Sequence, residues 1–309
     1  MKKAGLILLM FFMGANKALT SPVIIASNFW TSQNVLSQIL HDTFKKNGIE
    51  SKLKKIKSGS QWRPIMAGKV HVQLEVWQGT METYFEKAVK SGKAIDAGAH
   101  EAQGREEWWY PSYAEKDCPG LPDWKALKKC AAKFNRGKGT KGIYVAGPWE
   151  KPDKARIRAL GLDFKVVPVK KGDDLWVELD KSVAKKEPIV LFNWSPNFIE
   201  AKYKGKFIEF PEYHPDCDKK ASWGISKKWK YDCGNPKGAW IKKLVSAKLP
   251  TINKCAFEIV KNFNFTNKMI AEAALFVDGD KMTVQDASKA WAKKYQSKLD
   301  SWIPANCKK

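Results

Sequence analysis

Four tryptophans each follow a short apolar segment and precede a helical pattern, and this recurrence constrains the fold more than any other feature. The clearest case is the segment 188–197, where the apolar run 189–192 predicts a buried strand. Ser195 and Pro196 are then typical of a helix cap and a first helical residue, which places Trp194 between strand and helix. In open α/β sheets this carboxyl end of a strand is where ligands bind.

The other three tryptophans occupy the same kind of junction. Trp30 follows the apolar segment 23–26, Trp77 ends the alternating segment 70–76, and Trp149 follows the segment 143–146. If the strand and helix units form two α/β lobes, two tryptophans from each lobe face one cleft. Aromatic rings that converge in this way suit a cation without hydrogen-bond donors, such as a quaternary ammonium group.

Each of these four side chains has a plainer alternative role, because tryptophan also fills hydrophobic cores and the chain has 14 of them. A ligand with an anionic end would need hydrogen-bond donors, and Asn193 is a candidate, with local capping as the alternative. Glu101 and Glu150 are candidates to oppose the cation, with a solvated carboxylate as the alternative for each.

The order of patterns predicts two lobes with two crossings between them. The segment 92–111 lacks strong periodicity, and residues 111–113 are the expected first crossing; Pro211 is the expected return. We therefore expect lobe 1 to comprise residues 21–112 and 212–309, and lobe 2 to comprise residues 113–211. Alternation over 70–76 predicts a half-buried strand. The tail is expected to be helical over 239–247, 252–262, 266–277 and 286–302.

The amino terminus and the cysteines indicate export. Residues 1–20 combine Lys2 and Lys3 with an apolar run and small residues, which is typical of a cleavable secretory signal peptide. Six cysteines follow, and six allow fifteen pairings. Their clustering favours three disulfides, with free buried thiols as the alternative: Cys118 with Cys130, Cys217 with Cys233, and Cys255 with Cys307. No Cys-x-x-Cys pair occurs, so we expect neither a redox site nor a bound metal.

Charge and motifs argue against two other classes of protein. The formal net charge is +23, but only five of the 55 basic residues are arginine and the lysines are scattered, which favours a soluble surface over a nucleic-acid site. The sequence lacks Gly-x-Ser-x-Gly and His-Glu-x-x-His, so no catalytic set or cofactor site is expected. A secreted α/β enzyme acting on a small quaternary amine, or a basic polyanion-binding surface protein, remains the alternative.

Several short motifs resemble the substrate-binding proteins of glycine betaine ABC transporters. They are Asn-Phe-Trp-Thr at 28–31, Glu-Val-Trp at 75–77, the aromatic run 107–113, Gly-Pro-Trp at 147–149 and Phe-Asn-Trp-Ser-Pro at 192–196. The resemblance implies a two-lobed type II periplasmic binding fold that closes on its ligand. It carries a tryptophan box onto Trp77, Trp149 and Trp194, with Trp30 as a fourth wall and Trp109 in reserve.

The cysteines and the segment 118–130 resemble a branch of that family that includes trimethylamine N-oxide binders. The resemblance implies a periplasmic monomer without enzymatic activity that delivers its ligand to a permease in the inner membrane. The expected ligand is a small methylated onium compound. Glycine betaine, trimethylamine N-oxide, choline, carnitine and dimethylsulfoniopropionate all remain open.

Overall fold

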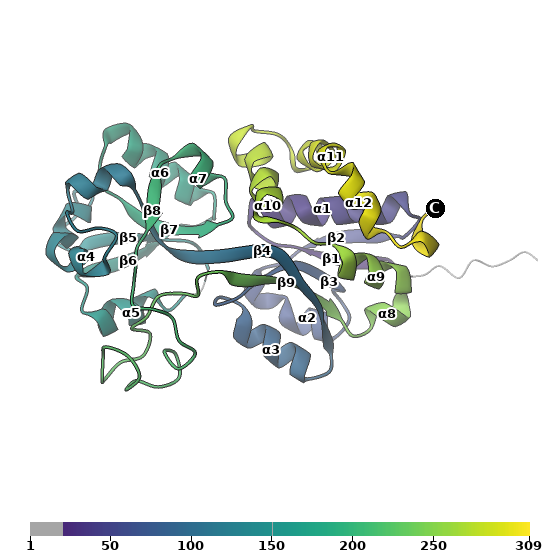
Figure 1. Ribbon diagram of the computed structural model, residues 1–309, viewed down its shortest axis with the longest axis horizontal. Coiled ribbons are helices and arrows are strands. Elements are labelled where there is room, and N and C mark those ends of the chain that lie inside the picture. Colours follow the sequence, from purple (N-terminus) through teal and green to yellow (C-terminus); the bar gives the residue numbers. More distant parts are fainter. Residues whose placement is uncertain (1–20, 150) are drawn as a thin grey trace, which may run out of the picture.

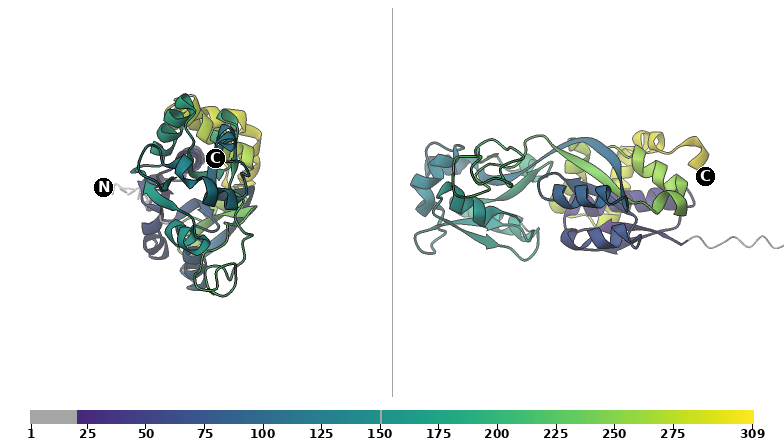
Figure 2. Two further views of the ribbon diagram at one scale, coloured as in Figure 1. Left: turned by 90° about the vertical axis from the view of Figure 1, so that its left-hand side faces the viewer. Right: turned by 90° about the horizontal axis from the view of Figure 1, so that it is seen from below.

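The chain forms two lobes placed end to end and joined through one long strand (Figures 1 and 2). The computed structural model describes residues 21–149 and 151–309, without the side chains of residues 200 and 201. The expected signal peptide, residues 1–20, and Glu150 therefore lie outside the described residues. In the described residues, eight strands follow one path, in the order β2-β1-β3-β9-β4-β7-β5-β6, and a ninth, β8, pairs with β4 off this path.

Lobe 1 is built on parallel strands with helices on both faces (Figure 1). Its strands are β1 (Val23–Ser27), β2 (Ser51–Lys55), β3 (Val72–Trp77), β9 (Ala239–Ser246) and the first part of β4 (Ala94–Pro111). Its helices are α1 (Thr31–Lys46), η1 (Ser58–Ser60), α2 (Trp62–Met66), α3 (Glu82–Lys90), α8 (Leu249–Ile252), α9 (Lys254–Asn262), α10 (Asn267–Ala274), η4 (Leu275–Gly279), α11 (Val284–Lys294), α12 (Gln296–Trp302) and η5 (Ala305–Cys307). Strands β1, β2 and β3 are parallel, and β9 runs antiparallel to β3.

Lobe 2 repeats the same arrangement on a smaller scale. Its strands are β5 (Gly142–Ala146), β6 (Phe164–Pro168), β7 (Val190–Ser195) and β8 (Gly205–Phe207), with β5 parallel to both β6 and β7. Its helices are η2 (Ser112–Lys116), α4 (Trp124–Cys130), η3 (Ala131–Phe134), α5 (Asp153–Leu160), α6 (Asp174–Lys185) and α7 (Ile199–Lys202). Helix α7 begins at Ile199, three residues after Pro196, which was expected to be the first helical residue.

Strand β4 carries the chain from one lobe to the other. It pairs with β9 up to Gly104 and with β7 from Arg105 onward, before its last residues pair with β8. The crossing therefore lies ahead of the residues 111–113 at which the sequence placed it. The reason is that residues 105–111, which lack a strong pattern, complete the sheet of lobe 2.

The segment 212–238, called the disulfide loop below, packs on lobe 2, although the sequence assigned it to lobe 1. The Asn235 side chain accepts a hydrogen bond from the Arg156 guanidinium at 3.0 Å, and the Arg158 guanidinium lies 4.0 Å from the centre of the Trp229 ring. Both arginines belong to α5. The chain returns to lobe 1 only at β9, so the second crossing follows this loop (Figure 1).

The three expected disulfides are confirmed, but two expectations about secondary structure are wrong. Cys118–Cys130, Cys217–Cys233 and Cys255–Cys307 are all bonded. The segment 239–247, expected as a helix, is mainly the central strand β9, which hydrogen-bonds to both β3 and β4. All six residues of β3 are buried rather than half of them, because the face with Gln73 and Glu75 is covered and its polar groups bond to one another.

In the described part of the chain, no helix combines the length and the apolar character needed to cross a bilayer.

Candidate functional site

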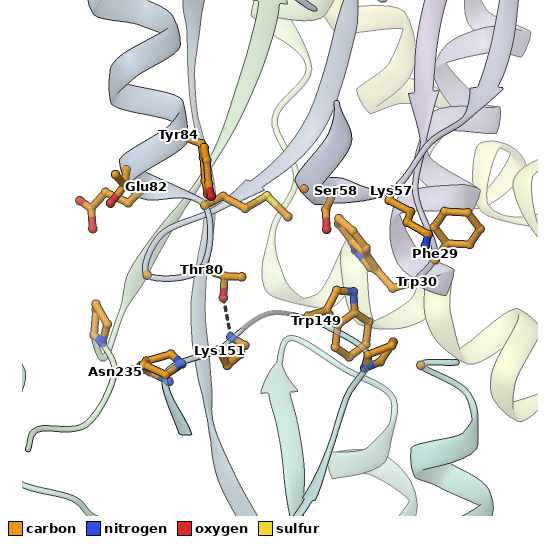
Figure 3. A pocket seen from close by; sticks show the side chains of 18 of the residues that line it. Phe29, Trp30, Lys57, Ser58, Thr80, Glu82, Tyr84, Trp149, Lys151 and Asn235 are labelled. Atoms are coloured by element: carbon orange, nitrogen blue, oxygen red, sulfur yellow. Dashed lines mark hydrogen bonds between the residues drawn. The ribbon is translucent and has the colours of Figure 1, made fainter. Parts of the chain in front are cut away.

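A cavity of about 1140 Å³ lies between the two lobes. Lobe 1 contributes the loops after β1, β2 and β3, and lobe 2 contributes the loops after β5 and β6 together with the disulfide loop. Except for the disulfide loop, these loops follow the carboxyl ends of parallel strands, which is the position expected for a ligand site in an α/β sheet. Figure 3 shows the walls, with Trp30 and Trp149 approaching each other from opposite lobes.

Trp149 forms the wall from lobe 2, and two glycines allow its position. A Cβ atom on Gly147 would lie 2.1 Å from Cε3 of the Trp149 ring, and one on Gly172 would lie 2.9 Å from Cη2. The ring therefore occupies the space that side chains at these positions would fill. The Gly-Pro-Trp motif is thus a structural requirement for the orientation of this tryptophan.

Trp194 lies behind Trp149 and does not border the cavity. Its ring meets Trp149 edge to face at 5.4 Å between centroids and packs against Trp176 at 5.3 Å. Phe192 completes this aromatic layer, 5.6 Å from Trp149. In this structure Trp194 therefore supports the wall that Trp149 forms.

Trp30 forms the wall from lobe 1, and Trp77 lies behind it. The indole N–H groups of both side chains donate to Oε2 of Glu75, at 2.7 Å for Trp30 and 3.2 Å for Trp77. Trp77 does not border the cavity, and its ring packs on Gly104 at the crossing of β4, where a Cβ atom would lie 3.0 Å from Cζ3.

The other candidate residues lie away from the cavity or outside the described residues. Trp109 is buried in lobe 2, where its ring occupies the space above Gly205. Asn193 is fully buried, and its Oδ1 accepts from Asn197 at 3.1 Å. Glu101, on β4, accepts from Asn264 at 3.0 Å. Glu150 is outside the part of the chain that the structure describes.

The sequence analysis did not predict the polar contact that Lys151 makes between the lobes inside the cavity. The Lys151 ammonium of lobe 2 donates to the hydroxyl of Thr80 in lobe 1 (Figure 3) and to Oε1 of Glu106 at 2.9 Å. Thr80 in turn donates to Oε2 of Glu106 at 2.5 Å. The same ammonium lies 4.5 Å from the centre of the Phe192 ring. A lysine next to a tryptophan motif carries no sequence signal for such a contact.

Glu75 is the second functional candidate that sequence reasoning missed. It is fully buried, and Oε2 accepts from Ser32 at 3.2 Å as well as from the two indoles. Burial raises the pKa of Glu75 to about 7, although its three hydrogen-bond donors lower it. The sequence did contain a signal: a glutamate inside a predicted strand of an α/β sheet is expected to be buried, because helices cover both faces of such a sheet.

A further carboxyl group stands where the lobes meet. Asp278 accepts from the Thr31 hydroxyl at 2.9 Å, and its pKa is raised to about 7 by burial and by the charge of Asp173 in lobe 2. Within residues 21–149 and 151–309, no three His, Cys, Asp or Glu side chains gather in a way that could hold a metal ion.

Comparison with known proteins places this geometry in a family. The model of the substrate-binding domain of ABC-type glycine betaine transport systems matches residues 21–294. A trimethylamine N-oxide-binding protein from Pelagibacter ubique (strain HTCC1062) is 35% identical over 292 residues, which cover 91% of this chain and 90% of that protein.

Two solved structures share the fold at lower identity. One is a glycine/betaine/L-proline-binding protein from Borrelia burgdorferi, with a TM-score of 0.73, 18% identity, and coverage of 93% of this chain and 98% of that one. The other is a lactococcal protein in a closed conformation complexed with glycine betaine, with a TM-score of 0.69, 20% identity, and coverage of 92% and 99%. The expected two-lobed type II periplasmic binding fold is thereby confirmed. The chain belongs to the family of substrate-binding domains of ABC-type glycine betaine transport systems.

Proposed function

We propose that the chain captures a small methylated onium compound between its lobes, with trimethylamine N-oxide as the first ligand to test. The observation that carries the proposal is the approach of Trp30 and Trp149 from opposite lobes across one cavity. Two electron-rich faces can hold a methylated cation that offers no hydrogen-bond donor. The 35%-identical relative, named for binding trimethylamine N-oxide, supports the choice of ligand.

The polar groups of the cavity suit the other end of such a ligand. The oxide or carboxylate oxygen of a zwitterion accepts hydrogen bonds, and the Lys151 ammonium borders the cavity with three N–H groups, two of which donate to Thr80 and Glu106. Lys151 lies on the same side of the cavity as Trp149 (Figure 3), and its ammonium lies 4.5 Å from the centre of the Phe192 ring in the aromatic layer. A ligand with adjacent positive and negative ends would therefore meet both rings and donors.

The remaining candidates take supporting roles in this proposal. Trp77 holds Trp30 through the shared carboxylate, and Trp194 holds Trp149 through ring packing, so both shape the box as lobes close. Trp109 belongs to the core of lobe 2, and Asn193 holds the turn after β7. Glu101 lies on the outer part of lobe 1, and Glu150 stays a candidate beside Trp149.

We further propose that the protein works as a monomeric, non-enzymatic receptor in the periplasm and delivers its ligand to an ABC permease in the inner membrane. The features of residues 1–20 support export by a cleavable signal peptide. Three disulfides suit an oxidising compartment. The scarcity of arginine supports a surface that does not bind nucleic acid.

Calorimetry on extensively dialysed protein tests the proposal with trimethylamine N-oxide, glycine betaine, choline and a neutral sugar. Trp30→Ala and Trp149→Ala should each weaken binding about 2- to 30-fold, because one cation–π contact contributes about 0.5 to 2 kcal/mol. Phe257→Ala is the control, since that partly buried ring of α9 borders no part of the cavity, and it should leave binding unchanged. Binding of no onium compound, or unchanged binding by Trp149→Ala, would reject the proposal.

A further inference from the structure

One buried carboxylate oxygen accepts hydrogen bonds from Trp30 and Trp77, the two candidate box tryptophans of lobe 1. Oε2 of Glu75 accepts from Trp30 at 2.7 Å, from Trp77 at 3.2 Å and from the Ser32 hydroxyl at 3.2 Å. The three donors come from the β1–α1 loop, from the end of β3 and from the first turn of α1. The orientation of the Trp30 wall is therefore fixed by an ionisable group that is itself closed off from solvent.

The core of lobe 1 offers no structural reason for a charge at this position. Oε1 of Glu75 has no hydrogen-bond partner among the described residues, and no described residue forms a salt bridge with this carboxylate. A buried carboxylate with one unpaired oxygen destabilises a fold, and a glutamine would accept the same hydrogen bonds without the charge. Strained or destabilising groups of this kind collect at functional sites.

We propose that Glu75 is the positioning residue of the onium site: its carboxylate fixes Trp30 as a wall and places a negative charge behind the ring that the cation contacts. The inference rests on the proposed function and deepens it. An indole N–H that donates to a carboxylate shares in the polarisation of the hydrogen bond, which enriches the ring in electrons. The buried charge also attracts the cation directly, because little solvent lies between them to screen it.

This arrangement makes ligand affinity depend on pH in a definite direction. The pKa of Glu75 is raised to about 7 by burial, so the carboxyl is mostly protonated at pH 6 and mostly ionised at pH 8. A cation on Trp30 favours the ionised form, and by linkage the ionised form binds the cation more tightly. Affinity therefore rises with pH, and the rise lies between about pH 6 and pH 8.

The other charged groups on elements around β3 bond elsewhere. On β9, Lys243 donates to carbonyls at the end of α9, and Lys242 pairs with Asp96. The two histidines next to β3 bond to the backbone, His100 at the Leu74 carbonyl and His71 at Ile24 and Gly68. On the helices, Glu82 of α3 accepts from Gln78, and in α1 His41 bonds to Ser51 and Asp42 bonds to Gln38 and Ser288. Asp278 also has a pKa of about 7 and faces Thr31. The titration of Asp278 changes ligand affinity equally in proteins that differ only at position 75. Its contribution therefore cancels when wild type and Glu75→Gln are compared.

The test compares wild type with Glu75→Gln at pH 6, 7 and 8, using calorimetry with trimethylamine N-oxide and glycine betaine, neither of which changes charge in this range. Wild type should bind about 3- to 10-fold more tightly at pH 8 than at pH 6, which is the range that a single group of pKa about 7 allows. Glu75→Gln should bind about 10-fold more weakly at pH 8 and lose most of the pH dependence. The same slope in both proteins, or equal affinity at pH 8, would overturn the inference.

Two further variants separate this inference from the function on which it rests. Trp149→Ala, in the other lobe, should lose affinity at every pH and keep the slope. If it weakens binding while Glu75→Gln behaves as wild type, only the role of Glu75 is wrong; if no onium compound binds wild type, the proposed function is wrong. Should Glu75→Gln fail to fold, Trp77→Phe removes one donor from the carboxylate and should move the midpoint of the pH profile upward. An unmoved midpoint would then count against the inference.

Discussion

At the scale of single residues, the wall formed by Trp149 depends on two neighbouring glycines as much as on the ring itself. Gly147 and Gly172 leave the space that the indole fills, and both lie in loops at the cavity. A methyl group on Gly147 would overlap the ring at 2.1 Å, so the ring must leave its place. The backbone at Gly147 does not have a positive φ angle, so alanine itself fits the local conformation.

Gly147→Ala should therefore weaken onium binding by about tenfold or more while the protein still folds, because it displaces a ring that contributes about 0.5 to 2 kcal/mol and disturbs the layer behind it. Gly59→Ala is the matched control: Gly59 borders the cavity, but a methyl group there meets no atom within 4 Å. Calorimetry and thermal unfolding of both variants check this. If the two alanine variants bind alike, the packing of Trp149 on Gly147 does not set its orientation.

The sequence located the tryptophans at strand ends but did not show which of them border the cavity and which lie behind its walls. Trp30 and Trp149 face the cavity, whereas Trp77 and Trp194 lie one layer behind them. That difference depends on how far each ring extends from the end of its strand and on what covers it. Glycines at 104, 147 and 172 and the carboxylate of Glu75 decide this, and three of their contacts join residues distant in sequence: Gly104 with Trp77, Gly172 with Trp149, and Glu75 with Trp30.

At the scale of elements, the disulfide loop forms part of the cavity wall and is anchored to lobe 2. Cys217, Cys233 and Asn235 border the cavity, and Asn235 bonds to the Arg156 guanidinium and to the backbone of Glu106. The Arg156–Glu107 pair, 2.6 Å apart and buried, anchors the same region to α5 and β4. The loop therefore connects a wall of the cavity with the strand that crosses between the lobes.

Removal of the disulfide in this loop should affect both stability and binding. The Cys217–Cys233 bond spans 16 residues and the Cys118–Cys130 bond spans 12, so loss of either by a Cys→Ala pair should destabilise the fold by a similar amount, about 3 kcal/mol. Only the first pair borders the cavity. Denaturant unfolding and calorimetry should therefore show similar losses of stability but weaker ligand binding for Cys217→Ala/Cys233→Ala alone. Equal binding by the two variants would contradict a role for the loop in the cavity wall.

Strands that are completed by distant partners were the hardest elements to predict. Strand β9 was expected as a helix because its apolar and charged residues fit either period, and only pairing with β3 and β4 makes it a strand. The second half of β4 carries Arg105, Glu106 and Glu107, polar residues that suggest no strand. The side chains of Arg105 and Glu107 form ion pairs within lobe 2, and Glu106 accepts from Thr80 of lobe 1, contacts that the local pattern does not reveal.

At the scale of the whole molecule, few connections join the lobes, and this arrangement permits closure. The chain crosses at Gly104 and Arg105 and again after the disulfide loop. Lys151 connects Thr80 of lobe 1 with Glu106, which lies just beyond the first crossing, so this contact sits near the hinge. Rotation about these strands would bring Trp30 and Trp149 together while the contact near the hinge moves least.

The cavity is large for the expected ligand, which leaves room for closure around it. At about 1140 Å³ it exceeds the range of about 300 to 1,000 Å³ usual for sites that enclose drug-sized ligands, and a methylated onium compound is far smaller. Such a ligand would leave most of the cavity unfilled, so we expect binding and closure to be coupled. The free energy of the contacts formed with both walls is what shifts the population toward the closed form.

Saturating trimethylamine N-oxide should therefore reduce the radius of gyration measured by small-angle X-ray scattering, whereas a neutral sugar should not. At a hundredfold excess over the dissociation constant, the ligand should also stabilise the fold by about 2.7 kcal/mol. Trp149→Ala, given enough ligand to reach the same occupancy, should show a smaller change in radius, because a wall that drives the approach is missing. A radius that stays constant while calorimetry reports full occupancy would mean that the ligand is held by one lobe alone.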